Sequence, residues 1–212
     1  MRLPFIPRDG LCRKCGRDAA GLNGEYLCED CVTHHPHFDR VSSVLRFEQD
    51  ARELVNSFKF REKTYLLGDF ADFLEGLAHV HFKLNDLDAV VPMPSTCLHR
   101  YLRGYNQCEL LARVLARRIG KPVKHLLRRV GNPVRQGGLS EADRRKNVID
   151  TFAPARLSTF RLFCPSAVPP STVLIVDDIM TTGSTLSEAA KTLKAMGVKQ
   201  VWGLTLARSI RY

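Results

Sequence analysis

Residues 173–185 read Val-Leu-Ile-Val-Asp-Asp-Ile-Met-Thr-Thr-Gly-Ser-Thr, an apolar run followed by two carboxylates and a turn rich in hydroxyl groups. The first four residues are apolar and three of them are β-branched, which is typical of a buried parallel strand. A helical pattern follows as far as Met196, and a second strand is expected over 200–206. Strand, helix and strand form a β-α-β unit, so we predict an α/β fold with a parallel sheet flanked by helices.

The turn in this stretch is suited to holding a phosphate group. Backbone amides at the start of the helix can surround a phosphate together with nearby hydroxyl groups, and Gly183 permits close approach of the backbone. The hydroxyl groups are those of Thr181, Thr182, Ser184 and Thr185. Thr185 and Glu188 also have the spacing of a capping box, which would delimit the helix.

The acidic pair, Asp177 and Asp178, is expected at the carboxyl end of the strand. Successive strand side chains diverge, so one carboxylate is expected to face a ligand's hydroxyl groups while the other contacts a metal or holds the loop. The alternative is that the pair only caps the helix and the turn is ordinary. An apolar strand, an acidic pair, Thr-Thr-Gly and a helix in immediate succession favour a binding site.

The rest of the main domain contains three further helical patterns and one short strand. Apolar residues recur at helical spacing over 51–60, 66–80 and 103–119, and the run 88–91 is typical of a strand that ends at Pro92. Two polar stretches, 128–145 and 153–171, are expected to be irregular, and a loop as long as the first is usually functional or disordered.

Four of the seven cysteines form two C-x2-C pairs separated by twelve residues, Cys12 with Cys15 and Cys28 with Cys31. This spacing predicts a structural zinc site in a small head, residues 1–38, ahead of a main domain at 39–212. The head has hardly any large apolar side chains, so the metal would replace a core. Two disulfides or a redox pair are the alternatives, and the reducing conditions expected for an unexported chain disfavour them.

Other candidate ligands follow the cysteines. His34, His35 and His37 are expected to form a solvated connection, because four thiolates already complete a tetrahedron. The remaining cysteines have no ligand spacing and are expected to be structural. These are Cys97, Cys108 and Cys164.

The chain of 212 residues is basic, with a formal net charge of +10. A filled four-thiolate zinc site would lower this charge to about +8, which still attracts polyanions such as nucleic acids or phosphorylated metabolites. A solvated basic surface is the alternative. No stretch has the roughly 18 apolar residues of a membrane span, and residues 1–10 lack a signal-peptide pattern. We expect a cytoplasmic protein without membrane insertion.

The stretch 173–185 resembles the PRPP motif of type I phosphoribosyltransferases, where PRPP is 5-phosphoribosyl-1-pyrophosphate. The resemblance implies the type I phosphoribosyltransferase fold, with magnesium bound alongside PRPP. It assigns the ribose hydroxyl groups to Asp177 and Asp178, and the 5-phosphate to Thr181, Thr182, Gly183, Ser184 and Thr185. Thr181 stands where purine-salvage members carry a carboxylate, so the resemblance does not favour purine salvage.

Further motifs extend the resemblance to the ComF/GntX family, over nearly the whole chain. Besides the cysteine head they include Val-Pro-Met-Pro at 91–94, Arg-Gly-Tyr-Asn-Gln at 103–107, Leu-Ser at 139–140, Asn-Val at 147–148 and Leu-Ala-Arg at 206–208. Members are similar to phosphoribosyltransferases in fold, and some are linked to DNA uptake during natural transformation. The family's acceptor substrate is unsettled.

The same resemblance implies two further parts of the site. Pro94 and Ser95 would expose backbone donors in a pyrophosphate loop, and Arg100 and Arg103 would supply charge through guanidinium groups that match pyrophosphate oxygens. Surface arginines on a basic helix are the alternative. The segment with Arg135, Gln136 and Arg144 corresponds to a lid over the substrate, with a Gly-rich linker as the alternative. Pro133 and Arg135 depart from the residues common among relatives.

Two classes of function stay open. The first is a phosphoribosyltransferase that works by positioning and electrostatics on an unassigned acceptor, with no general base named. The second is a non-catalytic PRPP sensor or scaffold whose head and basic face engage single-stranded DNA or a DNA-uptake protein. Aromatic residues beside basic ones at 58–61 and 100–105 could stack on bases, although apolar packing is their commoner role.

Overall fold

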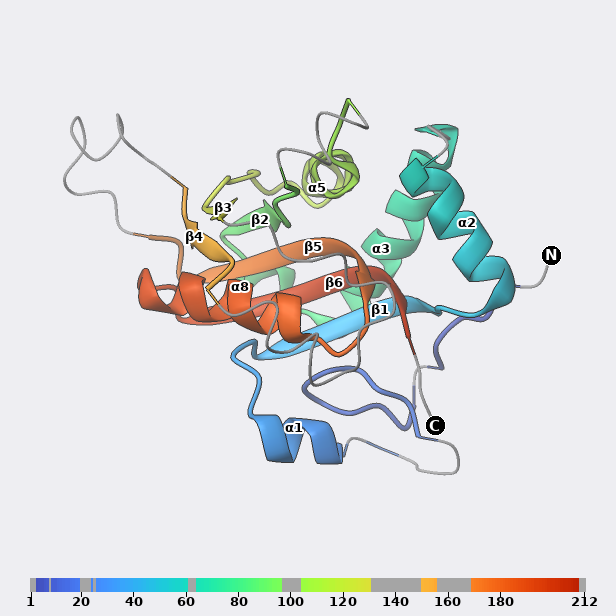
Figure 1. Ribbon diagram of the computed structural model, residues 1–212, viewed down its shortest axis with the longest axis horizontal. Helices are drawn as coiled ribbons and strands as arrows, with labels where there is room; N and C mark the ends of the chain where they lie inside the picture. Colours follow the sequence, from blue (N-terminus) through green and yellow to red (C-terminus); the bar gives the residue numbers. More distant parts are fainter. Residues whose placement is uncertain are drawn as a thin grey trace.

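The computed structural model describes residues 3–7, 9–19, 24, 26–60, 64–96, 104–130, 150–155 and 169–209. Four parallel strands form its central sheet in the order β1-β6-β5-β2 (Figure 1). They are β1 (Arg40–Arg46), β2 (Ala89–Pro92), β5 (Thr172–Met180) and β6 (Gln200–Arg208). Along β5, Val173 and Ile175 belong to one core cluster, whereas Leu174 and Val176 belong to another. Both faces of the sheet are therefore covered, and the predicted α/β fold is confirmed.

Three helices cover one face of the sheet: α2 (Gln49–Phe60), α3 (Leu67–His81) and α5 (Gln107–Arg118). Short 3-10 turns, η1 (Thr64–Leu66) and η2 (Leu84–Asp86), flank α3. The first two predicted helices are confirmed. The third begins four residues later than expected, because the Asn106 side chain accepts a hydrogen bond from the Cys108 amide and caps it there. Within the described part of the chain, none of the helices combines the length and apolar character that a bilayer span needs.

The other face carries α8 (Ser184–Ala195), a hairpin of β3 (Leu127–Arg129) and β4 (Phe152–Pro154), and the cysteine head with α1 (Glu29–His34). We use the name cysteine head for the described residues between 9 and 38. Its four cysteines share a core cluster with Val41 of β1 and Leu186 of α8. The head thus packs against the sheet and α8.

The hairpin corrects the expectation that 128–145 and 153–171 are irregular from their first residues. Arg128 pairs with Ala153, and Arg129 pairs with Phe152, in antiparallel register. The backbone hydrogen bonds of this hairpin join segments more than twenty residues apart, so no local sequence pattern predicts them. Residues 131–149 and 156–168 lie outside the described chain.

Strand β5 is longer than expected. It keeps its parallel pairing with β6 as far as the pair Met180 and Arg208, three residues beyond Asp177. The acidic pair therefore lies inside the paired strand, and the turn over 181–183 begins only after Met180. Helix α8 and strand β6 complete the predicted β-α-β unit.

Candidate functional site

The four cysteines of the head converge. Cys12 and Cys15 lie in a turn, Cys28 precedes α1, and Cys31 lies in its first turn. All four are buried, and their sulfur atoms lie within 4.8 Å of one another. No described cysteine is in a disulfide, and the Sγ atoms of Cys15 and Cys28 are 3.6 Å apart. Among the described residues no histidine joins the cluster, which can hold a metal ion in tetrahedral thiolate ligation.

Three of the four thiols have pKa values shifted by their neighbours. Hydrogen bonding to Cys12 lowers the pKa of Cys15 to about 6, and hydrogen bonding to Cys15 lowers the pKa of Cys28 to about 6. Hydrogen bonding to Cys12 and Cys15 raises the pKa of Cys31. Metals are bound by thiolates, so a cluster in which two sulfurs ionise below neutral pH fits a metal centre.

The head is fastened to the first strand through its backbone. The Val41 amide donates to the Lys14 carbonyl oxygen at 2.7 Å. Gly16 has a φ of +67°, and a β-carbon there would lie 2.7 Å from the Val41 carbonyl oxygen. Only glycine permits this approach, so the turn that carries Cys12 and Cys15 is held in contact with the sheet.

Asp177 and Asp178 are both buried and both face the start of α5. Gln107 Nε2 donates to Asp178 Oδ2 at 2.8 Å, and Cys108 Sγ donates to Asp177 Oδ1 at 3.4 Å. A carboxylate oxygen from each aspartate and the Cys108 sulfur lie within 4.8 Å of one another. Helix α5 therefore fixes the acidic pair.

The prediction that these two side chains diverge is wrong. Asp177 Oδ1 accepts from the Asp178 amide at 2.9 Å, and Asp178 Oδ1 accepts from the Ile179 amide at 2.7 Å. Each carboxylate is thus bent forward along the chain by a local hydrogen bond, which brings the two together.

The hydroxyl turn leads directly into α8. Gly183 is the N-cap, with a φ of +79°, and a β-carbon there would lie 2.6 Å from Met180 Cε. Thr182 Oγ1 and Ser184 Oγ are hydrogen-bonded at 2.7 Å. The predicted capping box is wrong because the helix begins at Ser184. The Glu188 carboxylate instead accepts from the Asp150 amide at 3.2 Å and pairs with Lys191.

The predicted phosphate residues fall into two groups. Thr182, Gly183 and Ser184 line a cavity of about 240 Å³ that residues of the cysteine head also line. Thr181 and Thr185 are half-buried beside it and do not line it.

The predicted pyrophosphate loop is described in part. Pro94 and Ser95 are half-buried and follow β2, which pairs with β5 as far as Pro92 and Val176. They therefore leave β2 where it lies beside Val176, the residue before the acidic pair. Arg100 and Arg103, and the predicted lid residues Arg135, Gln136 and Arg144, lie outside the described residues.

Arg129 is a site residue that the sequence did not indicate. It lies opposite Phe152 on the inner side of the hairpin, with its guanidinium 5.4 Å from the centre of the Phe152 ring. Its Nε is buried without a hydrogen-bond partner. Burial lowers the pKa of Arg129, and the nearby Asp177 opposes that shift. Arg129 thus brings a cation from the hairpin into the neighbourhood of Asp177. Side chains alternate between the two faces of a strand, so the exposed Arg128 could have indicated that Arg129 points inward.

The aromatic residues that were considered for base stacking make other contacts in the described part of the chain. Phe58 is fully buried and packs edge-on against Phe70, so of the two alternatives it is apolar packing that holds for this residue. The Tyr105 hydroxyl donates to the Phe58 carbonyl oxygen at 3.1 Å. The side chains of residues 59–61 and residues 100–103 lie outside the described part of the chain.

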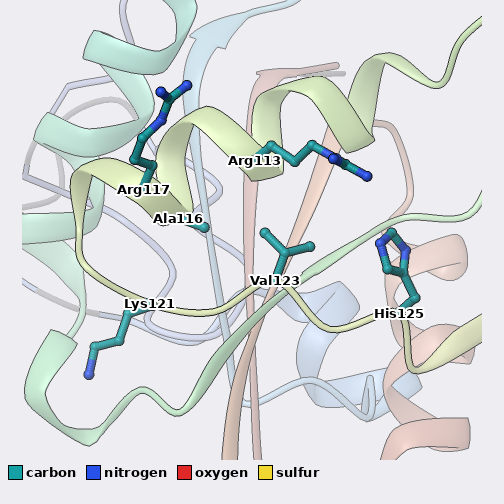
Figure 2. A pocket seen from close by; sticks show the side chains of 6 residues that line it. All are labelled: Arg113, Ala116, Arg117, Lys121, Val123 and His125. Atoms are coloured by element: carbon teal, nitrogen blue, oxygen red, sulfur yellow. The ribbon is translucent and has the colours of Figure 1, made fainter.

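A basic groove of about 370 Å³ lies between α5 and the segment that follows it (Figure 2). Its cationic residues are Arg113, Arg117 and Lys121, and His125 also lines it. Figure 2 shows their charged ends fanning out around Ala116 and Val123 rather than converging on one point. Glu109 pairs with two of them, Arg113 and His125. This spread suits an extended polyanion better than a single small anion.

Comparisons with known proteins agree with the fold of the main domain. The Phosphoribosyl transferase domain family matches residues 107–210. The chain is 30% identical to competence protein F of Haemophilus influenzae, over 95% of this chain and 93% of that protein. It is also 30% identical to DNA utilization protein YhgH of Salmonella typhimurium, over 93% of this chain and 84% of that protein. Adenine phosphoribosyltransferase from Saccharomyces cerevisiae is 16% identical, with a TM-score of 0.35 over 74% of this chain and 68% of that structure.

Proposed function

The chain belongs to the competence protein F (ComF) family, and on this premise we propose that it binds PRPP with magnesium and acts in DNA uptake. The observation that carries the proposal is the acidic pair, held between β5 and α5 immediately ahead of the hydroxyl turn. Relatives named for competence and DNA utilization support the role in DNA uptake.

In this proposal each part of the site has one task. Asp177 and Asp178 accept hydrogen bonds from the ribose hydroxyl groups, and the turn 181–185 receives the 5-phosphate at the start of α8. Gln107 and Cys108 position the acidic pair, and Pro94 and Ser95 offer backbone donors to the pyrophosphate. Four thiolates in the head hold a structural zinc ion.

As an enzyme, the protein would transfer the phosphoribosyl group to an acceptor nitrogen. Magnesium would neutralise pyrophosphate charge as the ribose C1 gains positive character. The chain's own contribution is to orient the ribose through the acidic pair and to hold the 5-phosphate still, so catalysis rests on positioning and electrostatics.

Titration calorimetry with PRPP tests the proposal. We expect the wild-type protein to bind PRPP in excess magnesium, and to bind it more weakly when EDTA removes the magnesium. Absence of binding at saturating magnesium would refute it. Pyrophosphate release with a panel of nitrogen acceptors then separates an enzyme from a PRPP-binding module, because a module binds without turnover.

A second function, binding of single-stranded DNA, is favoured by the basic groove beside α5. Arg117 and Lys121 line it, and their charged groups point in opposite directions (Figure 2). A strand lying in the groove would place successive phosphates beside successive cations, which favours binding without sequence readout.

Reversing two charges in this groove tests that role. We expect Arg117→Glu with Lys121→Glu to weaken binding of an oligothymidine and to flatten its salt dependence by about 1.4 in log-log slope, roughly 0.7 per lost phosphate contact. Lys83→Glu with Lys199→Glu changes the net charge equally at exposed positions outside the groove and is the control. Equal losses in both variants, measured by fluorescence anisotropy across a salt series, would mean that only net charge matters.

A further inference from the structure

The cavity beside the hydroxyl turn has walls from two parts of the chain. The cysteine head supplies one wall, which includes Cys15 and Phe38. The turn supplies the other with Thr182, Gly183 and Ser184, and the last residue of β6, Arg208, also lines it. The cysteine head and the candidate phosphate turn therefore line the same open pocket of about 240 Å³.

Arg208, which lines this cavity, is a buried cation with one N–H donor that has no hydrogen-bond partner. Its exposed fraction is 2%, and its Nε has no hydrogen-bond partner. Nη1 donates to the Cys15 carbonyl oxygen and lies 3.9 Å from Met180 Sδ. Among the described residues no carboxylate pairs with it. A buried guanidinium with an unsatisfied N–H is costly unless a further partner completes it.

Two more contacts tie the head to the turn. The His37 amide donates to Ser187 Oγ, one turn into α8, at 3.1 Å. The Phe38 ring lies against Gly183, where it would be 3.5 Å from a β-carbon. The conformation of the turn and the folding of the head therefore depend on each other.

We propose that Arg208 is the cation of the phosphate site at the start of α8 and that the cysteine head aims it through the Cys15 carbonyl. The inference rests on the proposed function and adds a ligand-binding residue and a task for the head. Its ligand group is a phosphate monoester. The positive end of the twelve-residue helix α8 and the hydroxyl turn would receive this group, and Arg208 would supply the charge that a lysine supplies in other phosphate loops.

The competing role for Arg208 is that of a counter-charge to the metal centre. A zinc ion with four thiolates carries a net charge of about −2, and Arg208 lies beside Cys15. In that role Arg208 would govern metal retention, with no contact to a phosphate ligand. The two roles predict different results when metal content and ligand affinity are measured on the same variants.

The test compares neighbouring arginines in the zinc-loaded full chain. Arg46 of β1 pairs in register with Arg208 and also reaches the head, where its Nε donates to Asp18 Oδ2 at 3.0 Å, but it does not line the cavity. We expect Arg208→Gln to weaken binding of ribose 5-phosphate roughly tenfold to a hundredfold by calorimetry, the size of a lost charge-assisted hydrogen bond. Arg46→Gln is expected to bind like wild type, and Arg208→Lys to fall between.

The outcomes are distinct. Equal affinity in Arg208→Gln and Arg46→Gln, each measured per zinc-loaded chain, would overturn the inference and leave the proposed function standing. Loss of zinc in Arg208→Gln with unchanged affinity of the loaded fraction would assign Arg208 to the counter-charge role. Wild-type protein that binds neither PRPP nor ribose 5-phosphate would refute both proposals.

A second measurement does not depend on whether Arg208→Gln folds. In ¹⁵N NMR spectra of the wild-type protein, the Arg208 Nε–H resonance, identified by its absence from Arg208→Lys, is expected to shift when ribose 5-phosphate is added. No shift at saturating ribose 5-phosphate would count against a phosphate contact.

Discussion

Cys28→Ser is expected to unfold the cysteine head and to remove nearly all of the bound zinc. Cys28 is buried, its sulfur is 3.6 Å from that of Cys15, and a serine hydroxyl is a poor replacement for a thiolate ligand. The buried apolar residues described between 9 and 38 are the four cysteines and Phe38. A head with so small a core would depend on a bound metal, and structural zinc contributes on the order of 10 kcal/mol to folding in comparable small sites.

Zinc content measured by atomic emission and the melting temperature measured by circular dichroism check this prediction. Wild-type protein is expected to hold one zinc ion per chain, and Cys28→Ser to hold close to none and to melt at a lower temperature. Cys108→Ser is the matched control, because Cys108 is also buried but lies on α5, outside the cluster. Full zinc content in Cys28→Ser, or equal zinc loss in Cys108→Ser, would contradict a four-cysteine site.

Loss of a metal ion from the cysteine head is also expected to affect the structure of the main domain. The Cys15 carbonyl is bonded to Arg208, and Phe38 packs against Gly183. The division of the chain at residue 38 remains a prediction, but the cysteines and α8 share one core cluster. Release of the metal is therefore expected to loosen the hydroxyl turn as well as the head.

Local sequence patterns predict only those parts of the sheet that depend on residues close together in the chain. The run 173–176 and the helix after Gly183 belong to one β-α-β unit, whose strands must be parallel neighbours. The extra length of β5 up to Met180 and the β3–β4 hairpin depend on which strand lies alongside. No pattern within a segment carries that information, because it is set by tertiary pairing.

The same distinction applies to the candidate site. The cysteine spacing and the turn 181–185 are local features, and the sulfur cluster was predicted correctly. Gln107 and Cys108 meet the acidic pair from about seventy residues away, and Arg208 meets Cys15 from the other end of the chain. A buried polar residue at a helix start is a weak signal alone, so only the packing of α5 against β5 reveals that Gln107 contacts Asp178.

The acidic pair invites an isosteric test because its carboxylates are buried and held from several sides. Asp177 accepts from the Asp178 amide and from the Cys108 thiol, so an asparagine at 177 can keep the shape of the site while it loses the charge. A carboxylate accepts a hydroxyl hydrogen bond more strongly than an amide oxygen does. The variant thus isolates charge from packing.

Asp177→Asn is therefore expected to weaken PRPP binding roughly tenfold to a hundredfold, since a hydrogen bond to a charged group contributes about 1.5–3 kcal/mol. Any acceptor-dependent pyrophosphate release should fall at least as far. Asp88→Asn is the control at the opposite end of the sheet. Asp88 directly precedes β2, and its carboxylate accepts from the amides of Ser171 and Thr172, where β5 begins, at 2.7 and 2.9 Å. That variant should lose some stability and keep its affinity. Calorimetry that finds equal PRPP affinity in wild type and Asp177→Asn would remove the acidic pair from the ligand site, because a charge that contacts ribose hydroxyl groups cannot be neutralised without effect.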